Sequence, residues 1–259
     1  MKLNEFVKLV DAIGSWDFTR TSDGNFKLIR EIQTKQKLVT NDFTGPYWIY
    51  AKFKLKGKEA IFRHNGELIK IKSKSFSLWF PPFSMIEITY ENVKLKGEML
   101  IGRDILEDNI ASNPMVIYKD NEKLPLNLKS VLARVKKFSK DGQEISLSNC
   151  ASALSLKCKK CLDQKFNSNI PISDISESLK TSHSYMTRTF KKDFGITPVF
   201  YRNWMRVMSA SFLLLEQNSI LETQEKVGFE DLSRFNKQFK RITHSTPRQF
   251  KPKRKSKNA

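Results

Sequence analysis

The sequence predicts an α+β protein, with an antiparallel β-barrel in its N-terminal half and an all-α C-terminal half. From about residue 16 to 118, short segments rich in β-branched and aromatic residues lie between turn signals such as Asn65-Gly66. This pattern is typical of small antiparallel barrels and sandwiches. From about residue 121, apolar residues recur every three or four positions, as they do in amphipathic helices. One helical segment also repeats 49 residues further along.

Changes in composition and in the spacing of apolar residues along the chain predict four segments. Residues 1–120 form a β-rich domain that opens with a short amphipathic helix over 3–13, where Leu3, Phe6 and Val10 share a face. Residues 121–167 form a helical connector, interrupted at Asp141-Gly142. Residues 168–251 form a second, helical domain. Residues 252–259 form a basic tail, which is expected to be solvated.

The charge of the chain points to a polyanionic partner. Forty-six Lys and Arg residues stand against 27 Asp and Glu residues, a net charge of +19, which suits nucleic acid or an anionic membrane surface. The longest apolar runs are far shorter than the ~20 residues of a spanning helix. The N-terminus lacks the unbroken apolar region that a secretory signal requires. Three cysteines form no even framework, which fits a reducing cytoplasm. We therefore expect a cytoplasmic protein that binds nucleic acid.

The repeat predicts two copies of one helical unit. The aligned positions are Arg188 with Lys237, Phe190 with Phe239, Lys191 with Lys240, Lys192 with Arg241, Thr197-Pro198 with Thr246-Pro247, and Tyr201 with Phe250. In each copy a short helix (172–179; 221–227) leads through a turn to a helix N-cap, Ser182 or Asp231. A second helix follows, with apolar residues on one edge and polar or cationic residues on the other.

Such a second helix suits the major groove of double-stranded DNA, because polar side chains reach base edges while cations hold phosphates. We expect Ser184, Thr187 and Arg188 to read bases in the first copy, and Ser233, Asn236 and Lys237 in the second. Phosphate contacts are expected from Lys191, Lys192, Lys240 and Arg241. Ser182, Tyr185 and Arg234 complete the predicted DNA-binding set. Residues 170–259 carry 17 Lys and Arg against 8 Asp and Glu, which disfavours an ordinary helical bundle.

At these residues the sequence resembles the AraC/XylS family of bacterial transcription regulators. The resemblance rests on three blocks between about residues 171 and 251: Ile175-Ser176-Glu177 with Met186 to Lys192, Gly195 and Thr197-Pro198; Tyr201, Arg206, Ala210, Leu213 and Leu214; and Gly228-Phe229, Asp231, Ser233, Phe235, Phe239-Lys240 and Thr246-Pro247. The resemblance implies a double helix-turn-helix domain and a transcription regulator, expected to be an activator. RNA polymerase, a second copy of the chain and a small-molecule effector are the further partners it implies.

Two positions depart from the family pattern. Lys180 stands where the first turn usually has Gly, and Gln224 stands where the second motif usually has a small residue. Neither change removes a predicted DNA contact. We expect each to loosen the packing of its own motif.

The resemblance also implies a cupin-like fold for residues 1–120, used for sensing or dimerisation. The aromatic residues of a pocket for an apolar effector would be Trp48, Phe53, Phe76, Trp79 and Phe83, although barrel core is the more common role of such residues. His64 is the only histidine before His183, which disfavours a cupin metal centre because such a centre needs several histidines. No catalytic residue, metal ligand or cofactor is predicted.

The three cysteines leave an alternative open. Cys150, Cys158 and Cys161 would share one face of a continuous helix, which favours a packed core face. A redox or metal switch is the rival reading, and it needs a fourth ligand or a thiol of lowered pKa.

Two other functions compete with a sequence-specific regulator. One is a nonspecific, architectural DNA binder that depends on charge alone. The other is an enzyme with a DNA-binding appendage, like the DNA-repair methyltransferases that carry a similar helical module. Those enzymes use a reactive cysteine in a Pro-Cys-His setting, and the chain contains no such tripeptide.

Overall fold

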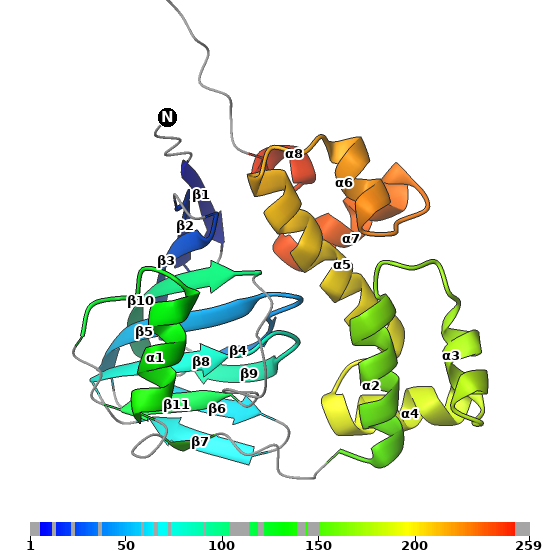
Figure 1. The fold of residues 1–259 in the computed structure, drawn as a ribbon, viewed down its shortest axis with the longest axis horizontal. Coiled ribbons are helices and arrows are strands. Elements are labelled where there is room, and N and C mark those ends of the chain that lie inside the picture. The colour runs from blue at the N-terminus through cyan, green and yellow to red at the C-terminus, as the bar shows by residue number, and fades with distance from the viewer. Residues whose placement is uncertain are drawn as a thin grey trace, which may run out of the picture. The chain divides into compact units, whose positions relative to one another are not determined.

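The computed structural model describes residues 6–11, 14–21, 24–35, 38–57, 60–64, 67–71, 74–90, 92–103, 114–118, 122–138, 143–144 and 151–251. The chain divides into two compact units, residues 1–152 and residues 153–259. The first unit contains every strand and one helix, and the second contains the remaining helices (Figure 1). This division confirms the predicted α+β class.

Two antiparallel sheets build the first unit. The larger has the strand order β1-β2-β3-β10-β5-β8-β11-β12, and the smaller has the order β4-β9-β6-β7. The strands are β1 (Phe6–Asp11), β2 (Gly14–Arg20), β3 (Phe26–Thr34), β4 (Leu38–Phe43), β5 (Trp48–Gly57), β6 (Ala60–His64), β7 (Glu67–Ile71), β8 (Ser75–Phe80), β9 (Met85–Tyr90), β10 (Val93–Gly102), β11 (Met115–Tyr118) and β12 (Gln143–Glu144). Among the described strands, no pairing joins the ends of either sheet, so the predicted barrel is not closed.

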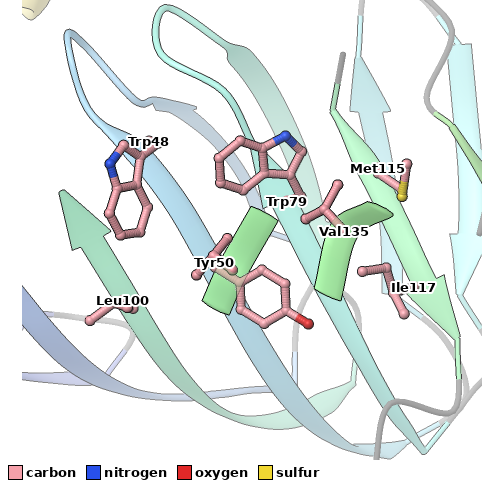
Figure 2. Packing of buried hydrophobic residues seen from close by; sticks show 8 residues of the cluster. Trp48, Tyr50, Trp79, Leu100, Met115, Ile117 and Val135 are labelled. Atoms are coloured by element: carbon pink, nitrogen blue, oxygen red, sulfur yellow. The ribbon is translucent and has the colours of Figure 1, made fainter. Parts of the chain in front are cut away.

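The helix α1 (Leu128–Phe138) covers part of one face of the larger sheet (Figure 1). Its buried residues Val131 and Val135 pack on an aromatic cluster formed by β5 and β8. Trp48 and Trp79 stack there with their ring centroids 6.3 Å apart. Figure 2 shows these side chains with Tyr50 and the aliphatic residues that complete the cluster, namely Leu100, Met115 and Ile117.

The N-terminal segment forms a strand where a helix was predicted. Residues 6–11 pair with β2 in an antiparallel register that sets Phe6 opposite Thr19 and Asp11 opposite Gly14. The three- and four-residue spacing of apolar residues is therefore misleading here. Pairing with a neighbouring strand satisfies the backbone groups of so short a segment better than a helix of marginal length does.

The predicted connector, residues 121–167, is divided between the two units. Its first helix, α1, belongs to the first unit, while α2 (Ala153–Lys165) belongs to the second. The reason is burial, because the apolar stripe of α1 packs on the sheet whereas α2 buries Cys158 and Leu162 within the helical unit. The predicted break at Asp141-Gly142 lies outside the described residues.

Seven helices make up the described part of the second unit. They are α2, α3 (Ile172–Ser178), α4 (His183–Phe194), α5 (Pro198–Leu215), α6 (Ile220–Lys226), α7 (Leu232–Thr243) and α8 (Pro247–Phe250). The long helix α5 lies between the α3–α4 pair and the α6–α7 pair (Figure 1). Twelve of its residues are buried, so it is the core of this unit. No helix in the described ranges has the length and apolar character to cross a membrane.

Candidate nucleic-acid interface

The two helix pairs are built by the same local signals. The Ser182 side chain accepts a hydrogen bond from the Tyr185 backbone N–H at 3.3 Å, and the Asp231 carboxylate accepts one from the Arg234 backbone N–H at 2.6 Å. Both bonds cap the first turn of the second helix. Both second helices also end at a residue with left-handed backbone, Gly195 or His244. A Thr-Pro pair then starts the next helix in each copy, which confirms the predicted repeat.

The turns show one difference that sequence comparison alone missed. In the turns, the Thr181 backbone N–H donates to the Ser176 carbonyl, and the Phe229 N–H donates to the Gln224 carbonyl, both at 3.1 Å. These bonds are related by 48 residues, whereas the helix caps are related by 49. The second turn therefore contains one extra residue, Glu230. A single offset applied to the whole repeat hides such an insertion.

Lys180 and Gly228 occupy equivalent left-handed positions in the two turns, with φ values of 54° and 80°. A lysine in this conformation is strained because its Cβ crowds the backbone. At Gly228 a side chain meets a second obstacle, because an added Cβ would lie 2.0 Å from the carbonyl oxygen of Asn167. The left-handed position of the first turn thus accommodates a side chain with some backbone strain, whereas that of the second turn has no room for one.

Gln224 does not loosen the second motif as predicted. Its side chain is 5% exposed, and its amide nitrogen donates a hydrogen bond to the Phe229 carbonyl in the turn. The larger side chain therefore ties the helix to its own turn. A buried amide without such a partner would destabilise the motif. The prediction considered only the size of the side chain and not this hydrogen bond.

The helix α4 has one buried edge and one open face. Met186 and Phe190 are fully buried, and the Phe190 ring lies 5.9 Å from the ring of Tyr201 on α5. The predicted DNA-binding residues lie on the other sides of the helix. Thr187 is half-buried, and the exposed members are Ser182, Ser184, Tyr185, Arg188, Lys191 and Lys192.

The helix α7 repeats this arrangement. Phe235 and Phe239 are fully buried, and the six predicted DNA-binding residues are exposed: Ser233, Arg234, Asn236, Lys237, Lys240 and Arg241. Two of the cations already have partners. The Arg234 guanidinium lies 3.5 Å from the Glu230 carboxylate, and the Arg241 guanidinium lies over the Phe200 ring, 4.9 Å from its centroid. These contacts limit the motion of both side chains.

Arginines of α5 hold the loop between α2 and α3, and sequence reasoning did not assign them this role. The Arg206 guanidinium donates to the carbonyls of Phe166 and Ser168, both at 2.7 Å. It also lies over the Phe229 ring, 5.4 Å from its centroid. One turn earlier, Arg202 donates to the Ile170 carbonyl. Burial, together with the nearby charges of Arg202 and Arg234, lowers the pKa of Arg206 to about 10.

The same loop also contacts the second motif through Gly228, which packs against Asn167. Residues 166–170 therefore touch both the helix that joins the two motifs and the turn of the second one. We call residues 166–170 with Arg202 and Arg206 the brace. Arg206 was recognised from the resemblance, but its carbonyl partners are known only from the structure.

A buried polar cluster joins α2 to α5. The Tyr201 hydroxyl donates to the Asp163 carboxylate at 2.5 Å, and the Lys159 ammonium lies 2.8 Å from the same carboxylate. Burial raises the pKa of Asp163, while Lys159 and Tyr201 act against that rise. Burial and the adjacent Asp163 also raise the pKa of Tyr201. The hydroxyl therefore stays protonated and available as a donor.

The cysteines of α2 do not show the features of a reactive pair. Burial first, then Cys161 and Asp163, raises the pKa of the Cys158 thiol to about 12, whereas a nucleophilic or metal-binding thiol needs a lowered pKa. Cys161 is half-buried, and Cys150 lies outside the described residues. Within the described ranges, no three His, Cys, Asp or Glu side chains gather in a way that could hold a metal ion.

The five residues of the predicted effector pocket do not line one cavity. Trp48 and Trp79 lie on the face of the larger sheet that α1 covers. Phe53 and Phe76 stack at 5.3 Å on the opposite face, because they occupy the alternate positions of β5 and β8. Phe83 lies in the turn after β8 with a φ of 63°. Strand alternation separates residues that are close in sequence. The side chain of His64 lies outside the described set.

Comparison with known proteins points in the same direction as this geometry. A sequence family described as "Helix-turn-helix domain" matches residues 175–253. An uncharacterized response regulatory protein of Staphylococcus epidermidis is 33% identical over 89 residues, which are 34% of this chain and 36% of that protein. The transcriptional regulatory protein HptR of Staphylococcus aureus is 32% identical over 89 residues, 34% of this chain and 35% of HptR. The chain thus spans about a third of the length of the curated relatives it matches.

One solved structure is similar over most of the chain. ToxT from Vibrio cholerae aligns with a TM-score of 0.50 at 12% identity, covering 88% of this chain and 97% of ToxT. At this identity the likeness concerns the fold alone, and it supports the order of a β-rich unit followed by a helical unit. The match over residues 175–253 confirms the helix-turn-helix domain that the sequence resemblance predicted.

Proposed function

We propose that this protein is a sequence-specific DNA-binding transcription regulator that reads two successive major grooves with α4 and α7. The observation that carries the proposal is the repeated open face of these helices. Both present small polar and cationic side chains at equivalent positions, and both are anchored through two buried residues one turn apart. In such an arrangement the base steps that the two helices read are separated by one helical turn of DNA, about 34 Å.

The side chains suggest which contacts are specific. Ser184, Thr187 and Arg188 face outward from the first half of α4, as Ser233, Asn236 and Lys237 do from α7. An arginine pairs best with guanine and an asparagine with adenine in the major groove. The later residues Lys191, Lys192, Lys240 and Arg241 are assigned to phosphates, which position the helices without carrying sequence information. Ser182 acts first as a helix cap.

The remaining parts of the proposal concern the whole chain. We assign it activation through RNA polymerase, pairing of two copies and control by a small-molecule effector. The names of the relatives support only a regulatory role. No catalytic step is assigned to it. A target in bacterial chromosomal DNA places the protein in the cytoplasm.

The test is selection of bound duplexes from a random pool at physiological salt. We expect one enriched sequence with two conserved blocks whose centres lie about 10–11 base pairs apart. A nonspecific architectural binder would enrich no sequence and would release all duplexes alike as salt rises. Genome-wide footprinting of the intact protein then identifies the target genes.

A further inference from the structure

The face of the larger sheet that carries α1 is divided between two kinds of surface. At one end of β5 and β10, apolar residues such as Tyr50 and Leu100 are buried beneath α1 (Figure 2). Further along the same two strands, this face carries Lys52 opposite Glu98, both half-buried, and beyond them only lysines that are open to solvent. We call these four exposed residues the lysine face: Lys54, Lys56, Lys94 and Lys96.

The strand register sets these lysines directly against one another. Lys54 lies opposite Lys96, and Lys56 lies opposite Lys94, on adjacent antiparallel strands. Like charges at directly opposed positions destabilise a sheet. Within the described residues, Lys96 alone among the four forms an ion pair, with Glu31 at 3.0 Å. Glu31 and Glu98 offset part of the repulsion at Lys96, and the face keeps a net positive charge through Lys54, Lys56 and Lys94.

We propose that the lysine face binds the phosphate backbone of DNA that flanks the site read by α4 and α7. This inference rests on the proposed function of the helical unit. Lysine ammonium groups are flexible, strongly hydrated point charges, which suit contacts with phosphates that do not depend on sequence. The four side chains come from two neighbouring strands, so they present charge over an area and not at a single point.

The chain's own architecture favours DNA over other polyanions. A duplex held by the helical unit is tethered to the first unit, so even weak contacts with the lysine face form at a high effective concentration. An acidic protein or an anionic membrane has no such second attachment among the contacts described above. The expected consequence is tighter binding of long duplexes than of short ones, with no change in the sequence that is read.

The experiment compares the intact protein with the variant K54Q/K56Q/K94Q/K96Q on two duplexes. One duplex contains only the site enriched by selection, and the other adds two helical turns, about 20 base pairs, on each side. Each phosphate contact contributes about 0.9 to the slope of log affinity against log salt. We expect the variant to lose roughly two to four units of that slope, and about tenfold or more in affinity at low salt, on the long duplex. On the short duplex it should match the intact protein.

The matched control is K70Q/K74Q/K123Q/K129Q, which removes four exposed lysines of the same unit that lie elsewhere. This control should bind both duplexes as the intact protein does. The variant should fold, because its four substitutions are at exposed positions and remove repulsion between opposed lysines, with the loss of one exposed ion pair, Lys96 with Glu31. Its thermal unfolding is checked first. If it does not fold, K54Q/K96Q replaces it, with about half the slope change expected.

Binding to polyglutamate and to anionic vesicles is measured as well, as probes for an acidic protein and a membrane. Three outcomes would overturn the inference: equal slopes for the variant and the intact protein on the long duplex, an equal loss of affinity in the control, or a loss of affinity for polyglutamate or vesicles with none for the long duplex. Failure of the underlying function looks different, because the intact protein would then enrich no sequence at all.

Discussion

The proposed role of Arg188 can be tested directly by substitution. It lies on the exposed face of α4, in the position that Lys237 occupies on α7. We expect Arg188→Ala to weaken binding to the selected site by about 1–3 kcal/mol and to relax preference at one base step. Competition binding with single-base variants of the site measures both effects. Lys165→Ala, which removes an exposed charge from α2, is the control.

An equal loss of affinity for the selected site and for random duplex would assign Arg188 to a phosphate. That result would contradict the base-reading assignment while leaving the proposed function in place, because phosphate contacts weaken binding to all sequences alike.

The second prediction concerns the stability of the fold and is made at Gly228. Gly228→Ala forces a side chain onto a left-handed backbone and against the Asn167 carbonyl, so we expect a loss of at least about 2 kcal/mol. Gly195→Ala is the matched control, since Gly195 has a similar φ of 76° but nothing within 4 Å of an added Cβ. It should lose only about 1 kcal/mol. Denaturant unfolding measures the difference, and equal losses would contradict the close approach to Asn167.

Asp163 makes the stability of the helical unit depend on pH. Burial raises its folded-state pKa above the ordinary value of 3.8, so the native state binds this proton more tightly than the unfolded chain does. The resulting stabilisation is complete below pH 3.8 and is lost as the pH rises through the folded-state pKa. Asp163→Asn removes this dependence while keeping an acceptor for Tyr201.

We therefore expect the free energy of unfolding of the intact protein to fall, relative to that of Asp163→Asn, as the pH rises above 3.8. Unfolding curves for both proteins over a pH series give this difference. A difference that stays constant, or that grows with pH, would show that the Lys159 ion pair outweighs burial.

At the scale of elements, α5 joins the two motifs and the brace determines how it is held. Arg206→Met leaves two loop carbonyls without their charged donor, and we expect a loss of about 2–3 kcal/mol in stability. Arg202→Met removes one donor and should lose about 1 kcal/mol. Thermal and denaturant unfolding rank the two variants. An Arg206 variant as stable as the wild type would mean that water replaces the guanidinium at both carbonyls.

The brace also bears on how well the two recognition helices keep their spacing. If it holds α5 against the second motif, Arg206→Met should tolerate one base pair inserted between the two blocks better than the wild-type protein does. Lys165→Met, which removes a charge from the neighbouring exposed surface, should not. A uniform loss on both duplexes would mean that the brace acts on stability alone.

Elements differed in how well the sequence predicted them. The helices of the second unit follow from caps, Thr-Pro starts and buried pairs that lie within a few residues of one another. The strand at residues 6–11 does not, because its conformation depends on pairing with β2. The prediction of one effector pocket was wrong for a related reason, because strand alternation places Trp48 and Phe53 on opposite faces of the sheet.

At the scale of the whole molecule, two units with different chemistry share a strong positive charge. The helical unit carries the repeated faces assigned to base reading, and the sheet unit carries the lysine face, whose opposed lysines are visible only in the strand register. A net charge of +19 predicts attraction to DNA at low salt whatever its sequence. Because such attraction carries no sequence information, the specificity that we propose rests on the side chains of α4 and α7.

The sequence by itself determined the α+β class and the repeat, and it predicted the recognition faces and a polyanionic partner. Those features depend on local signals, namely caps, periodicity and net charge, which act over one or two helical turns. Only the tertiary structure decided that no pairing among the described strands closes a barrel, that the connector divides between two units, and which lysines face one another. These features depend on contacts between residues far apart in the chain. Such contacts form through strand pairing and through the joint burial of apolar side chains, and no local sequence pattern specifies either.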